Sequence, residues 1–89
     1  MTVELFGMSR ALAGRPTVTL AVEGTVDYAG FLQALADAVP ALVPDVIVPA
    51  RDALVEPNLL LLDGRRPPRD GERFGDDDRP CVLFLASGG

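Results

Sequence analysis

Histidine, lysine and tryptophan are absent from this sequence, which also has one cysteine and one tyrosine. Without histidine, neither a Ser-His-Asp catalytic set nor a zinc site built on histidine can be assembled. A single cysteine cannot form an internal disulfide, which fits a reducing compartment. We therefore expect a protein that supplies no catalytic side chain of its own and binds no metal.

Long apolar runs and an excess of basic residues are lacking as well. No run is long enough to span a bilayer, and the first residues lack the charged, apolar and cleavable pattern of a targeting segment. Eight basic residues, all arginine, stand against thirteen acidic ones, and the net charge of −5 argues against nucleic acid as a partner. We expect a cytoplasmic protein with no nucleic-acid or membrane partner, and a basic partner is favoured. With no lysine, only the Met1 amine remains to receive an isopeptide bond.

Four segments have the pattern of β-strands. Residues 3–6 and 17–22 alternate between apolar and polar and predict a β-hairpin. Residues 58–62 predict a short strand that is apolar on both faces, and residues 80–86 predict the last strand. With 89 residues, 48% of them hydrophobic, the chain forms one domain with a single core.

One amphipathic helix is predicted between these strands, from about 27 to 39. Its apolar residues recur at helical spacing, namely Tyr28, Phe31, Leu32, Leu35 and Val39. Thr25 is the expected N-cap and Pro40 ends the helix. The proline-rich segment 40–57 predicts turns, with one helical turn near 51–54.

The sequence ends on Gly88-Gly89, shortly after an apolar run at 81–85. Two residues without Cβ can thread a narrow channel in another protein and present the terminal carboxylate to a reagent held there. Residues 87–89 also offer no large apolar side chain to bury. We therefore predict a folded domain at 1–86 and a flexible Gly-Gly tail at 87–89.

This element order and the Gly-Gly end resemble the β-grasp small sulfur carriers of the MoaD/ThiS family, which includes the molybdopterin synthase small subunit and the thiamine-pathway carrier. The resemblance covers the whole chain. Its matching pieces are residues 3–6 followed by Arg10-Ala11-Leu12, the helix, Leu62-Asp63-Gly64, Asp76-Asp77-Asp78 and Gly88-Gly89. It implies an α+β, ubiquitin-like β-grasp fold, with a mixed sheet of four to five strands packed on one main helix.

The resemblance also implies a function for Gly89, with Gly88 beside it. A ubiquitin-activating-type adenylating enzyme would use ATP to join the Gly89 carboxylate to AMP, and sulfur would then displace AMP. The resulting thiocarboxylate would donate its sulfur to a sulfur-accepting synthase subunit in cofactor or metabolite biosynthesis. The chain would be a carrier, or the small subunit of such a synthase, with no bound cofactor. Two alternatives stay open: a ubiquitin-like modifier conjugated through Gly89, and a non-catalytic interaction domain.

Strand parity predicts where a partner binds. Because side chains alternate between the two faces of a sheet, inward-facing Val3, Val82 and Leu60 place their neighbours on the opposite face. The same parity places Phe84 inward. The predicted partner-binding residues are Phe6, Met8, Leu59, Leu61, Leu83, Leu85 and Ser87. The alternatives are that the 40–57 segment covers this face, or that it forms a homodimer.

Three smaller features each allow two interpretations. Cys81 is a packed strand residue or a redox partner of the thiocarboxylate. The acidic run at 76–78 caps a turn or binds a cation, although its spacing does not match a calcium loop. The arginines of the 65–73 segment are solvated or steer an acidic partner.

Overall fold

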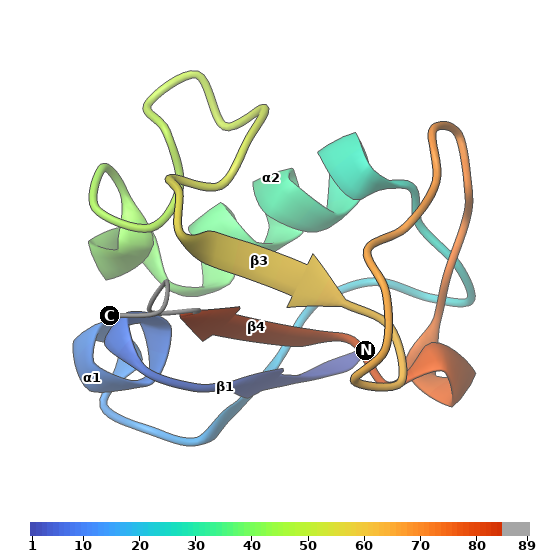
Figure 1. The fold of residues 1–89 in the computed structure, drawn as a ribbon, viewed down its shortest axis with the longest axis horizontal. Coiled ribbons are helices and arrows are strands. Elements are labelled where there is room, and N and C mark those ends of the chain that lie inside the picture. Colours follow the sequence, from blue (N-terminus) through green and yellow to red (C-terminus); the bar gives the residue numbers. More distant parts are fainter. Residues whose placement is uncertain (85–89) are drawn as a thin grey trace.

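The computed structural model describes residues 1–84 and contains one mixed four-stranded sheet. The strands are β1 (Thr2–Leu5), β2 (Thr17–Thr19), β3 (Asn58–Leu61) and β4 (Cys81–Phe84). Their order across the sheet is β2-β1-β4-β3, with β1 parallel to β4 and both outer pairs antiparallel (Figure 1). The first and last strands are therefore central neighbours. Among the described residues there is no fifth strand in this sheet.

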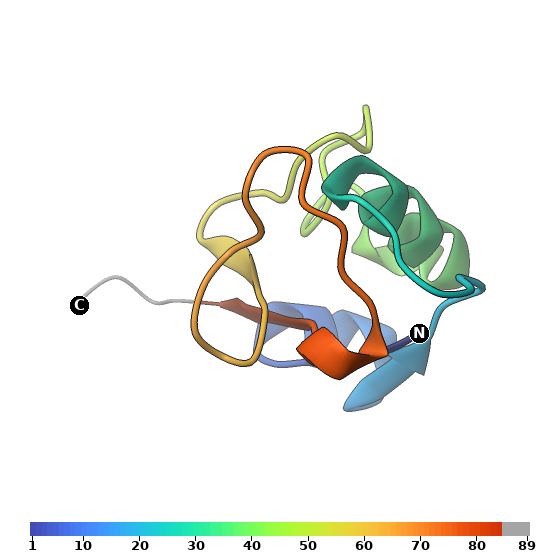
Figure 2. The ribbon, with the colours of Figure 1, turned by 90° about the vertical axis from the view of Figure 1, so that its right-hand side faces the viewer.

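Helix α2 (Tyr28–Ala38) packs against one face of the sheet (Figure 2). Phe31, Leu32 and Leu35 have no exposed surface, so the predicted apolar face of the helix is confirmed. The ring of Phe31 lies against that of Phe74, with 5.6 Å between the ring centroids. The helix therefore supplies the centre of the core.

The N-cap of α2 differs from the prediction. Asp27, not Thr25, accepts the hydrogen bond from the Gly30 amide at 2.9 Å. The Thr25 hydroxyl instead accepts a hydrogen bond from Arg73 Nε at 3.1 Å. An aspartate immediately before the first helical residue is the better placed acceptor, because a cap bonds the amide two or three residues ahead.

The 40–57 segment lies on the α2 side of the sheet. Its Leu42, Val46 and Ile47 are fully buried in the same core as Phe31. Its only helical turn is the 3-10 helix η1 (Pro40–Leu42), so the turn predicted at 51–54 is wrong. The segment does not cover the opposite sheet face, which we call the outer face. The alternative that the 40–57 segment covers the outer face is therefore wrong.

Between β1 and β2 the structure contains a short helix that the sequence did not predict, α1 (Met8–Ala13). Gly14 ends it in the left-handed conformation, with φ of 74°, and its amide bonds Arg10 O at 2.9 Å. The two strands do pair with each other in antiparallel orientation, but the connection between them contains helix α1 instead of a simple turn. The second strand is also shorter than predicted, ending at Thr19. No helix among residues 1–84 is long and apolar enough to cross a membrane.

Candidate partner surface and carboxyl-terminal site

The apolar half of the outer face is formed by β3, β4 and the residue that follows β1. Leu59 pairs with Leu83, and Leu61 pairs with Cys81. The Phe6 amide donates to Val82 O at 2.9 Å, so Phe6 continues β1 by one residue and faces outward by parity. We call Phe6, Leu59, Leu61 and Leu83 the outer patch. The sheet brings together all four of these predicted residues.

The other half of the outer face is polar. Thr2 and Glu4 on β1 and Thr17 and Thr19 on β2 are all exposed. The outer face therefore has an apolar side bordered by a polar side.

Exposure within the outer patch is uneven. Phe6 is 42% exposed, whereas Leu59, Leu61 and Leu83 are half-buried because each packs beside a cross-strand neighbour. Parity alone could not predict this, since it gives the face of a side chain but not how far its neighbours cover it. The patch is thus a largely flat apolar surface with one projecting ring.

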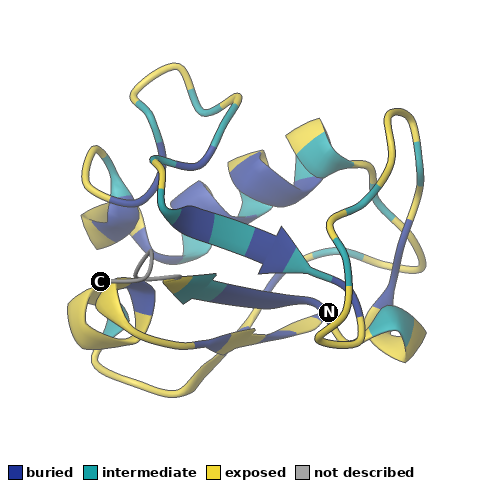
Figure 3. Ribbon diagram, viewed as in Figure 1, coloured by how far each residue is buried: buried dark blue, intermediate teal, exposed yellow. Residues whose placement is uncertain are grey.

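Phe84 contradicts the parity prediction, which placed it in the core beside Val82. It is 37% exposed at the end of β4 (Figure 3), where it lies beside Gly7 at the start of α1. Met8 and Leu12 on α1 are 40% and 37% exposed. Met8 was among the predicted partner-binding residues. The sequence analysis did not predict that Leu12 and Phe84 are exposed apolar residues. The helix that presents Leu12 had one sequence signal, the run of good helix formers ending at Gly14.

Gly7 lets the end of β4 approach α1. Its φ is 68° and its ψ is −132°, a region open to glycine alone, and a Cβ built there would lie 2.7 Å from Phe84 Cβ. Gly7 therefore allows Phe84, the last described residue of β4, to lie close to the start of α1.

Replacing Gly7 with alanine should cost about 1–3 kcal/mol in backbone strain and should also displace Phe84. Gly14→Ala is the matched control, because Gly14 also has a positive φ but a Cβ there would meet nothing within 4 Å. Urea unfolding and amide chemical shifts measure both effects. Equal losses of stability in the two variants, with Phe84 unshifted in both, would contradict this account of the contact.

The acidic run forms the 3-10 helix η2 (Asp76–Asp78) and acts as a cap. Asp76 Oδ1 accepts a hydrogen bond from the Thr2 amide at 2.7 Å, and Asp78 Oδ2 accepts one from the Gly75 amide at 2.9 Å. The turn-capping interpretation is confirmed. No group of three or more acidic or cysteine side chains within residues 1–84 is arranged to hold a metal ion.

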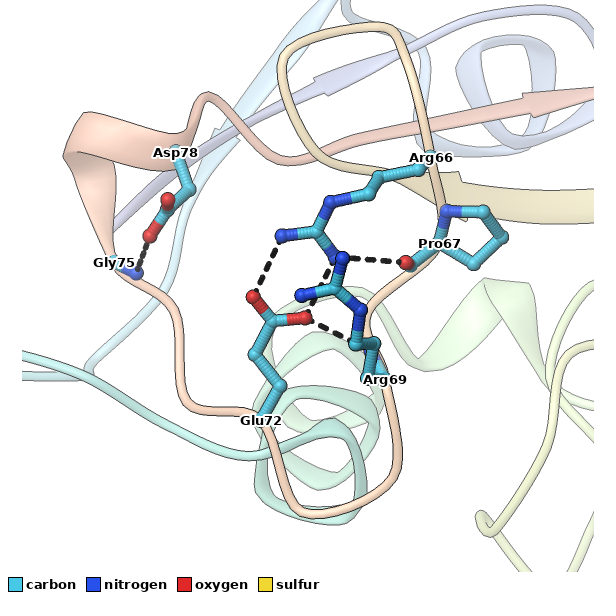
Figure 4. Close-up of polar contacts among 6 residues, drawn as sticks. All are labelled: Arg66, Pro67, Arg69, Glu72, Gly75 and Asp78. Carbon is cyan, nitrogen blue, oxygen red and sulfur yellow. Dashed lines mark hydrogen bonds and ion pairs between the residues drawn. The ribbon is translucent and has the colours of Figure 1, made fainter.

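The arginines of the 65–73 segment are partly structural. Arg66 donates to both carboxylate oxygens of Glu72 at 2.7 Å, and the Arg69 amide donates to the same carboxylate at 2.8 Å (Figure 4). Arg73 donates to Thr25 O at 2.8 Å. These bonds hold the segment in a defined loop. The hydrogen bonds from Arg66 and the Arg69 amide lower the pKa of Glu72 from 4.5 to about 2.

A pH dependence follows from Glu72. Because its pKa is lower in the folded protein, the stabilisation is complete above pH 4.5 and is lost as pH falls toward about 2. Thermal unfolding of the protein and of Glu72→Gln should therefore differ at neutral pH and converge at the acidic end of this window. If the difference in thermal stability between the two proteins stayed constant across this pH range, the ion pair of Glu72 with Arg66 would not be the source of the stabilisation.

Cys81 is 8% exposed, and burial raises the pKa of its thiol. The side chain lies on the outer face between Leu61 and Glu4, its partners on the two neighbouring strands. A thiol that is covered and kept protonated is a weak nucleophile. This environment favours the packing interpretation of Cys81.

Four predicted site residues, Leu85, Ser87, Gly88 and Gly89, lie outside the described residues. The structure reaches Phe84, the end of β4, on the same strand as Leu83 of the outer patch. The roles of Leu85, Ser87, Gly88 and Gly89 therefore remain predictions, as does the domain boundary at residue 86.

The four-stranded mixed sheet on one main helix is the ubiquitin-like β-grasp fold. The chain is similar to the crystal structure of SAMP1 from Haloferax volcanii, with 29% identity and a TM-score of 0.78 over 100% of this chain and 98% of that one. It is also similar to the crystal structure of H. volcanii small archaeal modifier protein 1, with 27% identity and a TM-score of 0.76 over 97% of each chain. No protein-family model matches the chain. A comparison with curated proteins likewise gave no match.

Proposed function

We propose that this chain is a ubiquitin-like modifier, activated at the carboxylate of Gly89 and joined through it to amines of target proteins. The observation that carries the proposal is the likeness, over nearly the whole length of both chains, to a protein named small archaeal modifier protein 1. Small proteins of this kind are generally substrates of an enzyme and not enzymes themselves.

The chemistry requires an activating partner. A carboxylate is a poor electrophile, so an adenylating enzyme of the ubiquitin-activating type would let the Gly89 oxygen attack the α-phosphorus of ATP, releasing pyrophosphate. A lysine amine of the target would then attack the carbonyl carbon and expel AMP, leaving an amide bond. Gly88 and Gly89 suit this role because neither has a side chain to obstruct a channel.

Sulfur transfer is the second candidate, and the sequence resemblance to the small sulfur carriers favours it. Sulfide in place of the amine would expel AMP from the same adenylate and leave a Gly89 thiocarboxylate. A sulfur-accepting synthase subunit would then be the partner. Both fates share the first step and differ only in the nucleophile.

Intact mass separates the two fates. The protein is incubated with an adenylating enzyme, ATP, a sulfide source and lysine-containing acceptor proteins. A modifier appears in higher-mass adducts, whereas a carrier gains the mass difference between one sulfur and one oxygen atom. If neither product forms with any adenylating enzyme supplied, the proposal fails.

The chain itself is a poor acceptor for such conjugation. All eight of its basic residues are arginine, so it has no side-chain amine. The Met1 nitrogen is buried and donates to Leu20 O at 3.1 Å and to Val22 O at 3.4 Å. This arrangement favours single attachment over chains built from copies of this protein.

The outer patch is proposed as the surface that docks the activating enzyme. Phe6→Asp and Leu83→Asp should each weaken binding about thirtyfold or more, because each places a charge in an apolar contact of about 2 kcal/mol or more. Both side chains lie on the outer face, so the fold should remain.

Thr19→Asp is the matched control, since Thr19 is exposed on the polar half of the same face. Calorimetric titration with the activating enzyme measures all three variants. Unchanged affinity in both patch variants, or an equal loss in the control, would place the docking surface elsewhere.

A further inference from the structure

Strand β2 forms one margin of the sheet. Within residues 1–84 it has a single neighbouring strand, β1. Figure 2 shows β2, in light blue, as the outermost strand, with α2 above it. Val18 is buried, whereas Thr17 and Thr19 are both exposed. The side of β2 that faces away from β1 is therefore accessible to solvent.

The hydrogen bonds between β1 and β2 identify which backbone groups of β2 are already used. The Leu20 amide donates to Met1 O at 2.7 Å, and the Leu5 amide donates to Pro16 O at 2.8 Å. Hydrogen-bonded and non-hydrogen-bonded pairs alternate along an antiparallel ladder. The even-numbered residues of the 16–20 segment therefore direct their backbone groups toward β1.

The odd-numbered residues direct theirs the other way. Thr17 lies opposite Glu4, and Thr19 lies opposite Thr2, in the pairs of the ladder that exchange no hydrogen bonds. The N–H and C=O groups of Thr17 and Thr19 therefore point away from the sheet. Among residues 1–84, no backbone hydrogen bond outside the sheet ladder involves either residue. An exposed edge with free donors and acceptors is a template for another extended chain.

A groove of about 330 Å³ lies beside this edge, between the end of β2 and α2. Its lining residues are Thr19, Ala21, Ala34, Asp37 and Ala38. The carboxylate of Asp37, the one charged lining residue, is paired with Arg51 at 3.0 Å. Ala34 and Ala38 lie one turn apart on α2 and are half-buried. Because most of the lining side chains are methyl groups, the groove has room for a larger aliphatic side chain from outside.

Strand pairing decides which residues of an added chain would enter the groove. Residues directly opposite each other in neighbouring strands share a face of the sheet. A residue opposite Val18 would face α2, because Val18 is buried on that face. Residues opposite Thr17 and Thr19 would lie beside the polar half of the outer face. The edge therefore fits a segment in which aliphatic residues alternate with polar ones.

A segment of another protein suits this edge better than a second copy of this chain. Each copy has a net charge of −5, and like net charges oppose self-association. A neutral or basic segment of a partner protein meets no such repulsion.

We propose that β2 binds an extended segment of a partner protein, which pairs antiparallel to it and places an aliphatic side chain in the groove beside α2. The segment would exchange backbone hydrogen bonds with Thr17 and Thr19, which is strand addition at a sheet edge. The pairing uses no residue of the outer patch, and β1 separates β2 from β4. The proposal is independent of the chemistry at Gly89.

Two fluorescein-labelled five-residue peptides of alternating valine and serine, with valine at both ends, test the pairing. One has N-methyl groups on its valines and the other has them on its serines. In the proposed register the serine amides face β2 and the valine amides face solvent, so only the methylated serines would block pairing. We expect the peptide with methylated valines to bind, and the peptide with methylated serines to bind at least about tenfold more weakly.

Fluorescence anisotropy measures both affinities, and amide chemical shifts of the full chain locate the site. The expected shifts are at Thr17, Thr19 and Ala34. The protein without Gly88-Gly89 should bind the peptide with methylated valines equally well. The proposal is overturned if that peptide does not bind at about 1 mM, if both peptides bind equally, or if the shifts are centred on the outer patch.

Variants of α2 test the side-chain contact. Ala34→Gln puts a longer neutral side chain in the groove and should weaken binding of the peptide with methylated valines about tenfold or more. Ala38→Gln should have the same effect and serves as the second groove variant. Ala29→Gln is the matched control, since Ala29 is exposed on the same helix and lies outside the groove. Thermal unfolding verifies that each variant is folded, and equal affinity in the control and in both groove variants would overturn the site.

Sedimentation velocity tests the competing occupant. We expect the free protein to be a monomer at the concentrations used for anisotropy. A dimer that the peptide with methylated valines dissociates would mean that a second copy of this chain occupies the edge of β2, and would overturn the proposal.

Discussion

Replacing Leu35 with alanine is expected to lower the free energy of unfolding by about 2–5 kcal/mol. Leu35 is fully buried on the face of α2 that packs on the sheet, beside Phe31 and Leu32. The substitution removes apolar contacts and leaves a cavity, and a domain of 89 residues has little stability in reserve. Leu35→Ala is therefore expected to be mostly unfolded at physiological temperature or close to it.

Gln33→Ala is the control, because Gln33 is exposed on the same helix. It should change stability by no more than about 0.5 kcal/mol. Urea unfolding followed by circular dichroism measures both variants. A midpoint for Leu35→Ala close to that of the control would show that α2 packs through another face.

Deleting Gly88-Gly89 should abolish conjugation and sulfur transfer alike, with almost no change in stability. The two residues have no side chains to bury, and the buried core of the described residues ends at Val82. Adding one residue after Gly89 should be equally damaging, because an amide replaces the free carboxylate and a side chain would obstruct a channel. Thermal unfolding and intact mass are measured on the same samples.

Gly89→Ala separates binding from reaction. It should bind the activating enzyme with unchanged affinity through the outer patch but react slowly, because patch and carboxylate contribute independently. A melting temperature that fell by many degrees on deletion would instead mean that the tail is structural. Reaction of the truncated protein would point to a different reactive group.

The main helix and the faces of the buried residues Val3, Leu5 and Val82 were predictable because they depend on periodicity. The spacing of Phe31, Leu32 and Leu35 predicts the helix, and the alternation of Val3, Leu5 and their neighbours predicts the sheet faces. These patterns are strong because a one-residue shift would expose a whole apolar set. The β-grasp fold itself was implied by the family resemblance and not by periodicity.

Short elements and degrees of exposure were not predictable. Helix α1 has six residues, too few for a periodic pattern, and Phe84 is exposed although strand parity places it on the α2 side of the sheet. The half-buried state of Leu59 and Leu83 depends on their pairing across two strands.

Tandem mass spectrometry of the conjugated or sulfur-loaded protein tests the proposed role of Gly89 most directly, because it locates the new covalent bond. The protein is reacted with an adenylating enzyme, ATP and an acceptor, and the C-terminal peptide is sequenced. The expected result is a bond at the carboxyl carbon of Gly89 and at no other residue. A bond at Cys81 or at an acidic side chain, with Gly89 unmodified, would contradict that role.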